Sequence, residues 1–170
     1  MTADEVIANK DNKEFALKAV SENGKFLDLV SPILQNDKEV VMTALEQDPE
    51  SLEFASDELK NDKEVILKGV RGAPWTVCYA SERLRADKEV ILESCKTYGQ
   101  ALYFASQELR ADRECVKAAV ENKGLIVKYA SLRLRSDKEI AEIAIKQDKR
   151  AYQFLSKELK DDEDIKKLIG

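Results

Sequence analysis

A serine recurs at intervals of 25 residues, and a serine hydroxyl is a side chain that can act as a catalytic nucleophile. A serine hydroxyl needs an adjacent base to act as a nucleophile, and the sequence contains no histidine to supply one. We therefore expect structural serines, with hydroxyls that bond the carbonyl four residues earlier or reach a neighbouring turn. The column consists of Ser31, Ser56, Ser81, Ser106, Ser131 and Ser156.

The remaining reactive side chains do not form a catalytic pattern. The sequence has no glycine-rich phosphate loop and no cluster with metal-ligand spacing, so we expect no catalytic residue, no metal and no cofactor. Cys78, Cys95 and Cys115 are odd in number and fall at unrelated places, which favours free thiols in a reducing compartment. We expect a protein that is not an enzyme. The alternative is an enzyme of unrecognised type that works through carboxylates alone.

A 25-residue internal repeat explains the spacing of the serines. Asp37, Asp62 and Asp87 each open the same run, Asp-Lys-Glu-Val. Related openings stand 25 residues apart along the whole chain, and such a repeat decides the fold. The repeats start at residues 12, 37, 62, 87, 112 and 137, and a shortened copy starts at 162.

Numbering each repeat from its Asp or Asn gives two helices per repeat. Position 1 is an N-cap residue type, and apolar or small residues at positions 4, 5, 8 and 9 share one face of a first helix. Gly or Pro at position 13 indicates a turn, and a second helix is predicted over positions 14–24. The fold class is therefore all-α: an α-solenoid of six helix-turn-helix repeats forming one domain over residues 1–170. A lead-in helix follows the capping-box pattern at Thr2, and residues 162–170 form a capping helix.

Several columns of the repeat are expected to pack between the helices. Position 8 is small, position 19 is small in the middle repeats, and position 23 is always Leu. Position 18 carries Phe, Tyr or Leu, which we interpret as core packing rather than as a cofactor-stacking stripe. Charged columns are expected to form a lattice of salt bridges, for example between Arg110 and Glu114 four residues later.

These columns together resemble a known family. The opening Asp-Lys-Glu-Val, a Gly, and then Ala-Leu-x-Phe/Tyr-Ala-Ser-x-x-Leu-Arg are similar to domain of unknown function 4116 over residues 12–161. The resemblance implies a helical repeat array. It brings no catalytic residues, because that family carries no assigned reaction. The first repeat departs most, with Pro32 and Ile33 in its second helix.

The amino-acid composition narrows the expected cellular location of the protein and the class of its partner. Charged residues make up 36% of the chain and hydrophobic residues 44%, with a net charge of −5. An acidic chain is a poor prior for nucleic-acid binding. No apolar run is long enough for a membrane span, and no secretion signal is visible. We expect a monomer that is cytoplasmic, or that is delivered into another cytoplasm without a visible signal.

One surface of the second helix carries the predicted site. Positions 14, 17 and 21 are mostly polar, but the middle repeats place large apolar residues there, beside arginines at position 24. An exposed apolar patch with a charged rim favours protein binding, with an effector or inhibitor as a narrower version. One alternative is single-stranded nucleic acid or RNA along the basic and aromatic stripe. Another is that the patch covers a loop, or that the tryptophan tucks into the turn before it. The predicted partner contacts are Trp75, Tyr103, Leu125, Leu132, Arg85, Arg110 and Arg135.

Overall fold

The protein is all-helical in a computed structural model that describes all residues from 1 to 170. Its contacts divide the chain into two compact units, Met1–Leu84 and Arg85–Gly170, and each is described by itself. That the whole chain forms one domain stays a prediction. None of the helices has the length and apolar composition that crossing a bilayer requires.

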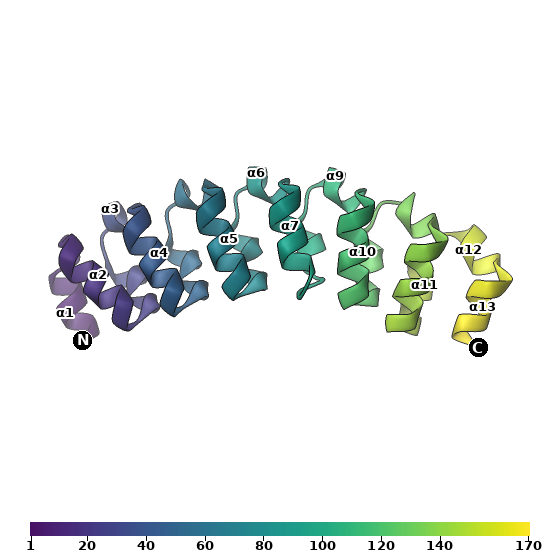
Figure 1. Cartoon of the computed structure of the whole chain (residues 1–170), viewed down its shortest axis with the longest axis horizontal. Coiled ribbons are helices and arrows are strands. Elements are labelled where there is room, and N and C mark those ends of the chain that lie inside the picture. Colours follow the sequence, from purple (N-terminus) through teal and green to yellow (C-terminus); the bar gives the residue numbers. More distant parts are fainter. The chain divides into compact units, whose positions relative to one another are not determined.

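The first unit has a row of long helices with shorter helices between them (Figure 1). α1 (Ala3–Ala8) is the predicted lead-in helix, and Thr2 and Glu5 form its capping box. α2 packs against α4, and α4 packs against α5. The long helices of this unit are α2 (Lys13–Glu22), α4 (Lys38–Gln47) and α5 (Lys63–Gly72). The short helices between and after them are η1 (Gly24–Leu29), α3 (Pro32–Gln35), η2 (Pro49–Phe54), η3 (Leu59–Asn61) and η4 (Pro74–Tyr79). α6 (Glu82–Arg85) spans the division between the units.

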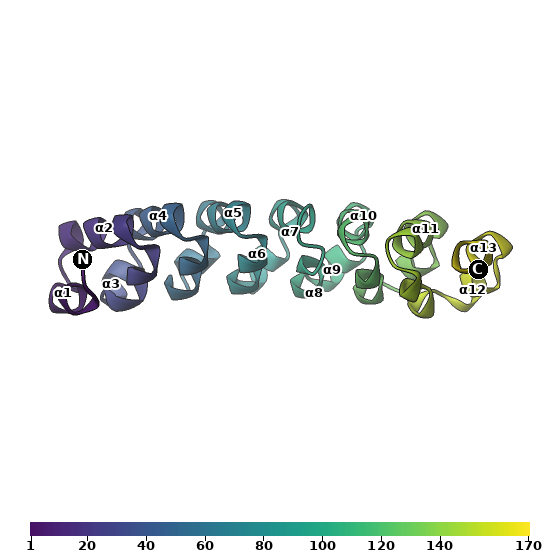
Figure 2. The same ribbon diagram turned by 90° about the horizontal axis from the view of Figure 1, so that it is seen from below.

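The second unit repeats the same arrangement in two layers. Figure 2 shows its long helices in one layer and its short helices in the other. α10 packs against both α7 and α11, and α11 packs against the capping helix α13. Its elements are α7 (Lys88–Cys95), α8 (Ala101–Phe104), α9 (Gln107–Arg110), α10 (Arg113–Asn122), η5 (Gly124–Tyr129), η6 (Leu134–Ser136), α11 (Lys138–Gln147), η7 (Lys149–Phe154), α12 (Lys157–Asp161) and α13 (Glu163–Ile169).

The first residue of each repeat caps the long helix, as predicted. The side chain of Asp112, for example, accepts hydrogen bonds from the backbone N–H groups of Glu114 and Cys115, both at 3.0 Å. An Asp at this position satisfies donors that the helix leaves unpaired and complements the helix dipole. The same cap is made by Asn12, Asp37, Asp62, Asp87, Asp137 and Asp162.

The predicted core columns are buried. Positions 5 and 8 of the long helices and position 19 have almost no exposed surface, as in Ile91, Ala119 and Ala105. Small residues at positions 8 and 19 let neighbouring helices approach closely. Each helix is too short to be stable in isolation, so this packing supplies most of its stability.

The continuous second helix predicted over positions 14–24 is wrong. A 3-10 helix or a short α helix covers positions 13–18, the next two residues are extended, and a separate short turn follows. Ala105 has φ −65° and ψ 153°, which is β-region backbone rather than helix. The helix breaks here because the N–H of the following serine bonds to another repeat instead of its own helix. Ser106 N–H donates to the Arg85 carbonyl at 3.1 Å.

The recurring serine is therefore both a cap and a junction. The Ser106 hydroxyl accepts from the backbone N–H of Leu109 at 3.3 Å and so begins α9. In the first unit, the Ser81 hydroxyl also donates to Asn61 of the preceding repeat at 2.7 Å. Of the two predicted roles, the contact with a neighbouring turn is confirmed and the bond to the carbonyl four residues earlier is wrong. The inter-repeat backbone bond recurs at all six serines, Ser31, Ser56, Ser81, Ser106, Ser131 and Ser156.

A ladder of ion pairs joins successive repeats, but its partners differ from the predicted ones. The basic residue at position 2 reaches positions 1 and 3 of the next repeat, so Lys88 bonds Asp112 at 2.8 Å and Glu114 at 2.9 Å. Glu114 is thus paired with Lys88, and the predicted pair with Arg110 is wrong. The hydrogen bonds that the Lys88 ammonium donates to the carboxylates of Asp112 and Glu114 raise the pKa of Lys88.

Candidate functional site

The predicted contact residues fall into both units. Trp75 belongs to the first unit, whereas the others lie in the second. Tyr103 and Leu132 are exposed, with 51% and 74% of their surfaces accessible. Position 18, predicted to be core, is half-buried in every repeat. The remaining predicted residues, Leu125, Arg85, Arg110 and Arg135, are half-buried.

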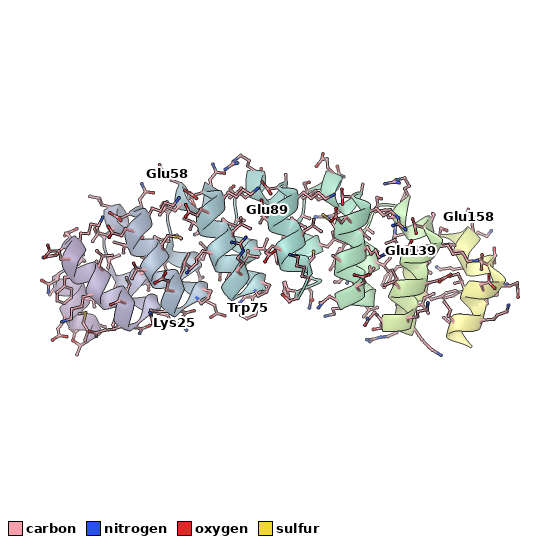
Figure 3. The ribbon with its side chains drawn as sticks, viewed as in Figure 1. Lys25, Glu58, Trp75, Glu89, Glu139 and Glu158 are labelled. Carbon is pink, nitrogen blue, oxygen red and sulfur yellow. The ribbon has the colours of Figure 1, made fainter.

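Trp75 is held by an acidic neighbour in the first unit. It lies on η4, and its Nε1 donates to the Glu50 carboxylate at 3.0 Å, one repeat earlier in the same column. Figure 3 shows Trp75 and Lys25 toward one edge of this unit and Glu58 at the opposite edge. Trp75 remains 47% exposed.

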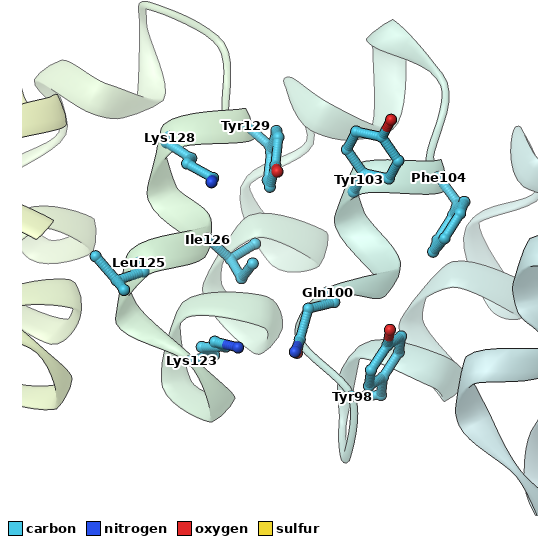
Figure 4. A pocket seen from close by; sticks show the side chains of 9 residues that line it. All are labelled: Tyr98, Gln100, Tyr103, Phe104, Lys123, Leu125, Ile126, Lys128 and Tyr129. Carbon is cyan, nitrogen blue, oxygen red and sulfur yellow. The ribbon is translucent and has the colours of Figure 1, made fainter.

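The second unit has a pocket between α8 and η5 (Figure 4). Its volume is about 340 Å³, at the small end of the range for ligand pockets. Tyr103 and Tyr129 stand at one end with their ring centroids 5.1 Å apart in an edge-on arrangement. Gln100 and Lys123 stand at the other end. The lining is completed by Tyr98, Phe104, Leu125, Ile126 and Lys128.

Two further hollows continue from this pocket within the same unit. Tyr129 also lines a hollow of about 550 Å³ together with Arg110 and Leu132. Leu132 and Arg135 line both this hollow and a smaller one, of about 130 Å³, beside Phe154. The shared residues make the three hollows one row, which we call the groove. Four predicted contacts besides Tyr103 line it: Leu125, Leu132, Arg110 and Arg135.

The arginines predicted as rim contacts have structural bonds. Arg110 donates from Nε to the Ala105 carbonyl at 2.9 Å and from Nη2 to the Tyr103 carbonyl at 2.8 Å. It thereby closes the end of α8 and positions Tyr103. Arg135 makes one longer bond, from Nη1 to the Phe154 carbonyl at 3.5 Å, and its buried Nε has no partner.

The two units differ in net charge. Residues 1–84 carry 17 acidic and 10 basic side chains, a net charge of −7, whereas residues 85–170 carry 16 and 18, a net charge of +2. The first pocket has Lys123 and Lys128 in its lining and no carboxylate. The Lys128 ammonium lies 4.7 Å from the centre of the Tyr129 ring, within cation–π range.

The remaining reactive groups are the three cysteines and the acidic side chains. Cys95 and Cys115 are buried free thiols, and burial raises the pKa of each to about 12. Cys78 is a half-buried free thiol. No group of three or more His, Cys, Asp or Glu side chains is placed to hold a metal ion.

Sequence reasoning missed the residues that complete the groove. Tyr129 and Phe104 were assigned to the core because their column repeats with the period of the fold. Lys123 and Lys128 stand in columns that carry both charged and uncharged residues elsewhere, so nothing singled them out. One signal was present: residues 123–129 combine two lysines with Leu125, Ile126 and Tyr129, and contain no acid.

Comparison with protein families gives one match. The model of the family described as Domain of unknown function (DUF4116) matches four times, over residues 12–60, 41–85, 62–110 and 112–160. The 49-residue matches each cover about two of the 25-residue repeats. No curated protein and no solved structure matches the chain.

Proposed function

The chain belongs to the family Domain of unknown function (DUF4116), and from that premise we propose that it is a non-catalytic helical-repeat scaffold that binds a partner protein through the groove of its second unit. A repeat array supplies an extended surface for binding. The family description names no reaction, so the proposal rests on the chemistry of that surface.

The observation that carries the proposal is the exposed apolar surface beside the groove. Half or more of the surface of Tyr103 and of Leu132 is exposed to solvent, whereas most other large apolar side chains of the chain are buried in the core. Apolar side chains gathered beside hollows with a charged rim mark interaction sites. Aromatic residues in such settings commonly supply much of the binding energy.

The serine column supports the non-catalytic part of the proposal. In five of the six repeats, that of Ser106 among them, the serine hydroxyl accepts a backbone N–H, and the chain offers no histidine beside it. A hydroxyl occupied in this way is a helix cap. Cys95 and Cys115 are equally unsuited, since they are buried and their high pKa keeps them protonated.

The test is affinity capture with matched variants. The double variant Tyr103→Ala/Leu132→Ala should lose the proteins that the natural chain retains, because it removes the exposed apolar surface of the groove. The matched control is Ile7→Ala/Ile33→Ala, which removes two exposed apolar residues of the first unit, 50% and 79% accessible. The control should retain them. Circular dichroism should show the same helicity in all three proteins.

Equal capture by the natural chain and the groove variant would overturn the proposal. Trp75→Ala is measured separately, because Trp75 belongs to the other unit and its place in the interface stays a prediction. A labelled single-stranded RNA provides the competing outcome. Tight, salt-sensitive RNA binding that Tyr103→Ala/Leu132→Ala abolishes would favour nucleic acid in place of a protein partner.

A further inference from the structure

The pocket between α8 and η5 has the size and lining for a single large side chain. Its volume of about 340 Å³ is small for a pocket that takes a whole ligand. Ile126 is almost fully buried, at 3% exposure, whereas Tyr103 and Tyr129 are only partly covered. Their rings meet edge-on, which leaves ring surface available to a third apolar group.

The cations at this pocket have no carboxylate partner in the protein. Most lysines in the ladder between repeats contact carboxylates, as Lys138 does with Asp162 and Asp164. Lys123 and Lys128 form no ion pair, and none of the nine residues that line the pocket is acidic. An apolar pocket bordered by two uncompensated cations is complementary to an apolar side chain flanked by carboxylates.

The row of hollows gives the ligand a direction. Tyr129 joins the first pocket to the second hollow, and Leu132 with Arg135 joins the second to the third. A chain that follows this row meets Arg110 and Arg135 and a single carboxylate, that of Glu108. The cationic excess therefore continues along the groove.

The second repeat, which lies in the first unit, carries the opposite charge in the matching columns. Glu50, Glu53 and Asp57 occupy positions 14, 17 and 21 of the second repeat, where the fifth repeat has Leu125, Lys128 and Leu132. All three acids are exposed. An acidic ligand would be repelled by this repeat, whereas the fifth repeat presents apolar and basic side chains at the same positions.

We propose, building on the function above, that the groove binds an extended acidic peptide segment of the partner, with an aromatic or large aliphatic side chain in the Tyr103–Tyr129 pocket and adjacent carboxylates paired with Lys123 and Lys128. Nucleic acid fits the observations less well. The unit has a net charge of only +2, whereas nucleic-acid binding surfaces are strongly basic.

Fluorescence anisotropy with the full chain and short fluorescein-labelled peptides tests this. The probes are a peptide with a central tryptophan between aspartates and glutamates, its tryptophan-to-alanine analogue, and a peptide with lysines in place of the acids. The first should bind, and it should bind at least about 30-fold more tightly than the alanine analogue, the usual effect of losing a central anchor. Affinity should fall as salt rises.

Matched charge reversals test the cations. Lys123→Glu/Lys128→Glu should weaken binding of the acidic tryptophan peptide about ten-fold or more, because it turns both attractions into repulsions. Lys96→Glu/Lys146→Glu changes the net charge equally on exposed residues outside the groove and should change affinity less than about two-fold. All four positions are exposed, so the folds should be preserved.

The results separate this proposal from the proposed function. If Tyr103→Ala/Leu132→Ala loses a partner protein but no acidic peptide binds, the peptide proposal fails and the binding function stands. Equal affinity for the acidic and the basic tryptophan peptides, or equal effects of the two charge reversals, would also overturn it. Preference for single-stranded RNA over every peptide would overturn both.

Discussion

A Cβ atom placed on Gly24 would lie 2.5 Å from the carbonyl oxygen of Ala44, in the next repeat. Gly24 opens η1, and its φ is not positive, so the glycine is required for space and not for a left-handed turn. The predicted turn lies here, between the end of α2 at Glu22 and the start of η1 at Gly24. The close approach lets η1 pack against α4.

Gly24→Ala should destabilise the protein by about 1–3 kcal/mol, because backbone at the junction must move to admit the methyl group. Urea denaturation followed by circular dichroism measures this. Gly170→Ala is the control, since the nearest atom to its added Cβ is 3.7 Å away. Equal stability of Gly24→Ala and the natural chain would show that the junction is not tightly packed.

Leu109→Ala should lower the free energy of unfolding by about 2–5 kcal/mol, as the truncation of a buried core residue does. Gln107, two residues earlier on α9, is exposed, and Gln107→Ala should stay within about 0.5 kcal/mol of the natural chain. Chemical denaturation compares them. Similar losses would mean that the buried and exposed faces of α9 have been assigned wrongly.

Ser106→Ala should cost about 0.5–2 kcal/mol, the usual effect of losing a side-chain N-cap. The chain contains its own comparison. Ser31 occupies the same position of the first repeat, but its side chain makes no cap hydrogen bond, and Pro32 already fixes the first residue of the helix. Ser31→Ala should therefore cost less than Ser106→Ala in the same unfolding assay; the reverse order would contradict the capping role.

Glu139 should give stability that depends on pH. Hydrogen bonds from Lys117 and Arg113 lower the pKa of Glu139 to about 2, from an ordinary value of 4.5. A carboxylate whose pKa is lowered in the folded state stabilises the protein at pH values above its ordinary pKa. This contribution is lost as the pH falls from about 4.5 to about 2. The stability difference between the natural chain and Glu139→Gln should therefore shrink over that interval. A constant difference would show that Glu139 is not held by these cations.

The fold was predictable where the repeat alone determines it. The N-caps, the buried columns and the lead-in helix follow from residue types at fixed spacing, as Asp112, Ala119 and Thr2 illustrate. The break before Ser106 was not predicted, since helical periodicity continues across it. Ser31-Pro32 was the available signal: a cap residue followed by proline marks a helix start, and the other serines share that column.

The site was predictable only in part. Exposure of Tyr103 and Leu132 was inferred from columns that are polar in other repeats, and the structure agrees. The bonds of Arg110 and the pocket beside Tyr129 depend on where side chains of different helices meet. A single sequence shows which residues recur together but not these distances, so the half-buried aromatic column was assigned to the core.

The backbone bond from each serine to the carbonyl 21 residues earlier also bears on how such a chain can change its length. Every junction uses the same donor and acceptor positions, so a 25-residue segment copied within one unit would bring one donor and one acceptor and leave neither unpaired. An insertion of any other length would break that correspondence. The addition of whole repeats is therefore the change in chain length that this backbone accommodates. Each added repeat would present its own side chains at positions 14, 17 and 21, and these could give it a different ligand preference.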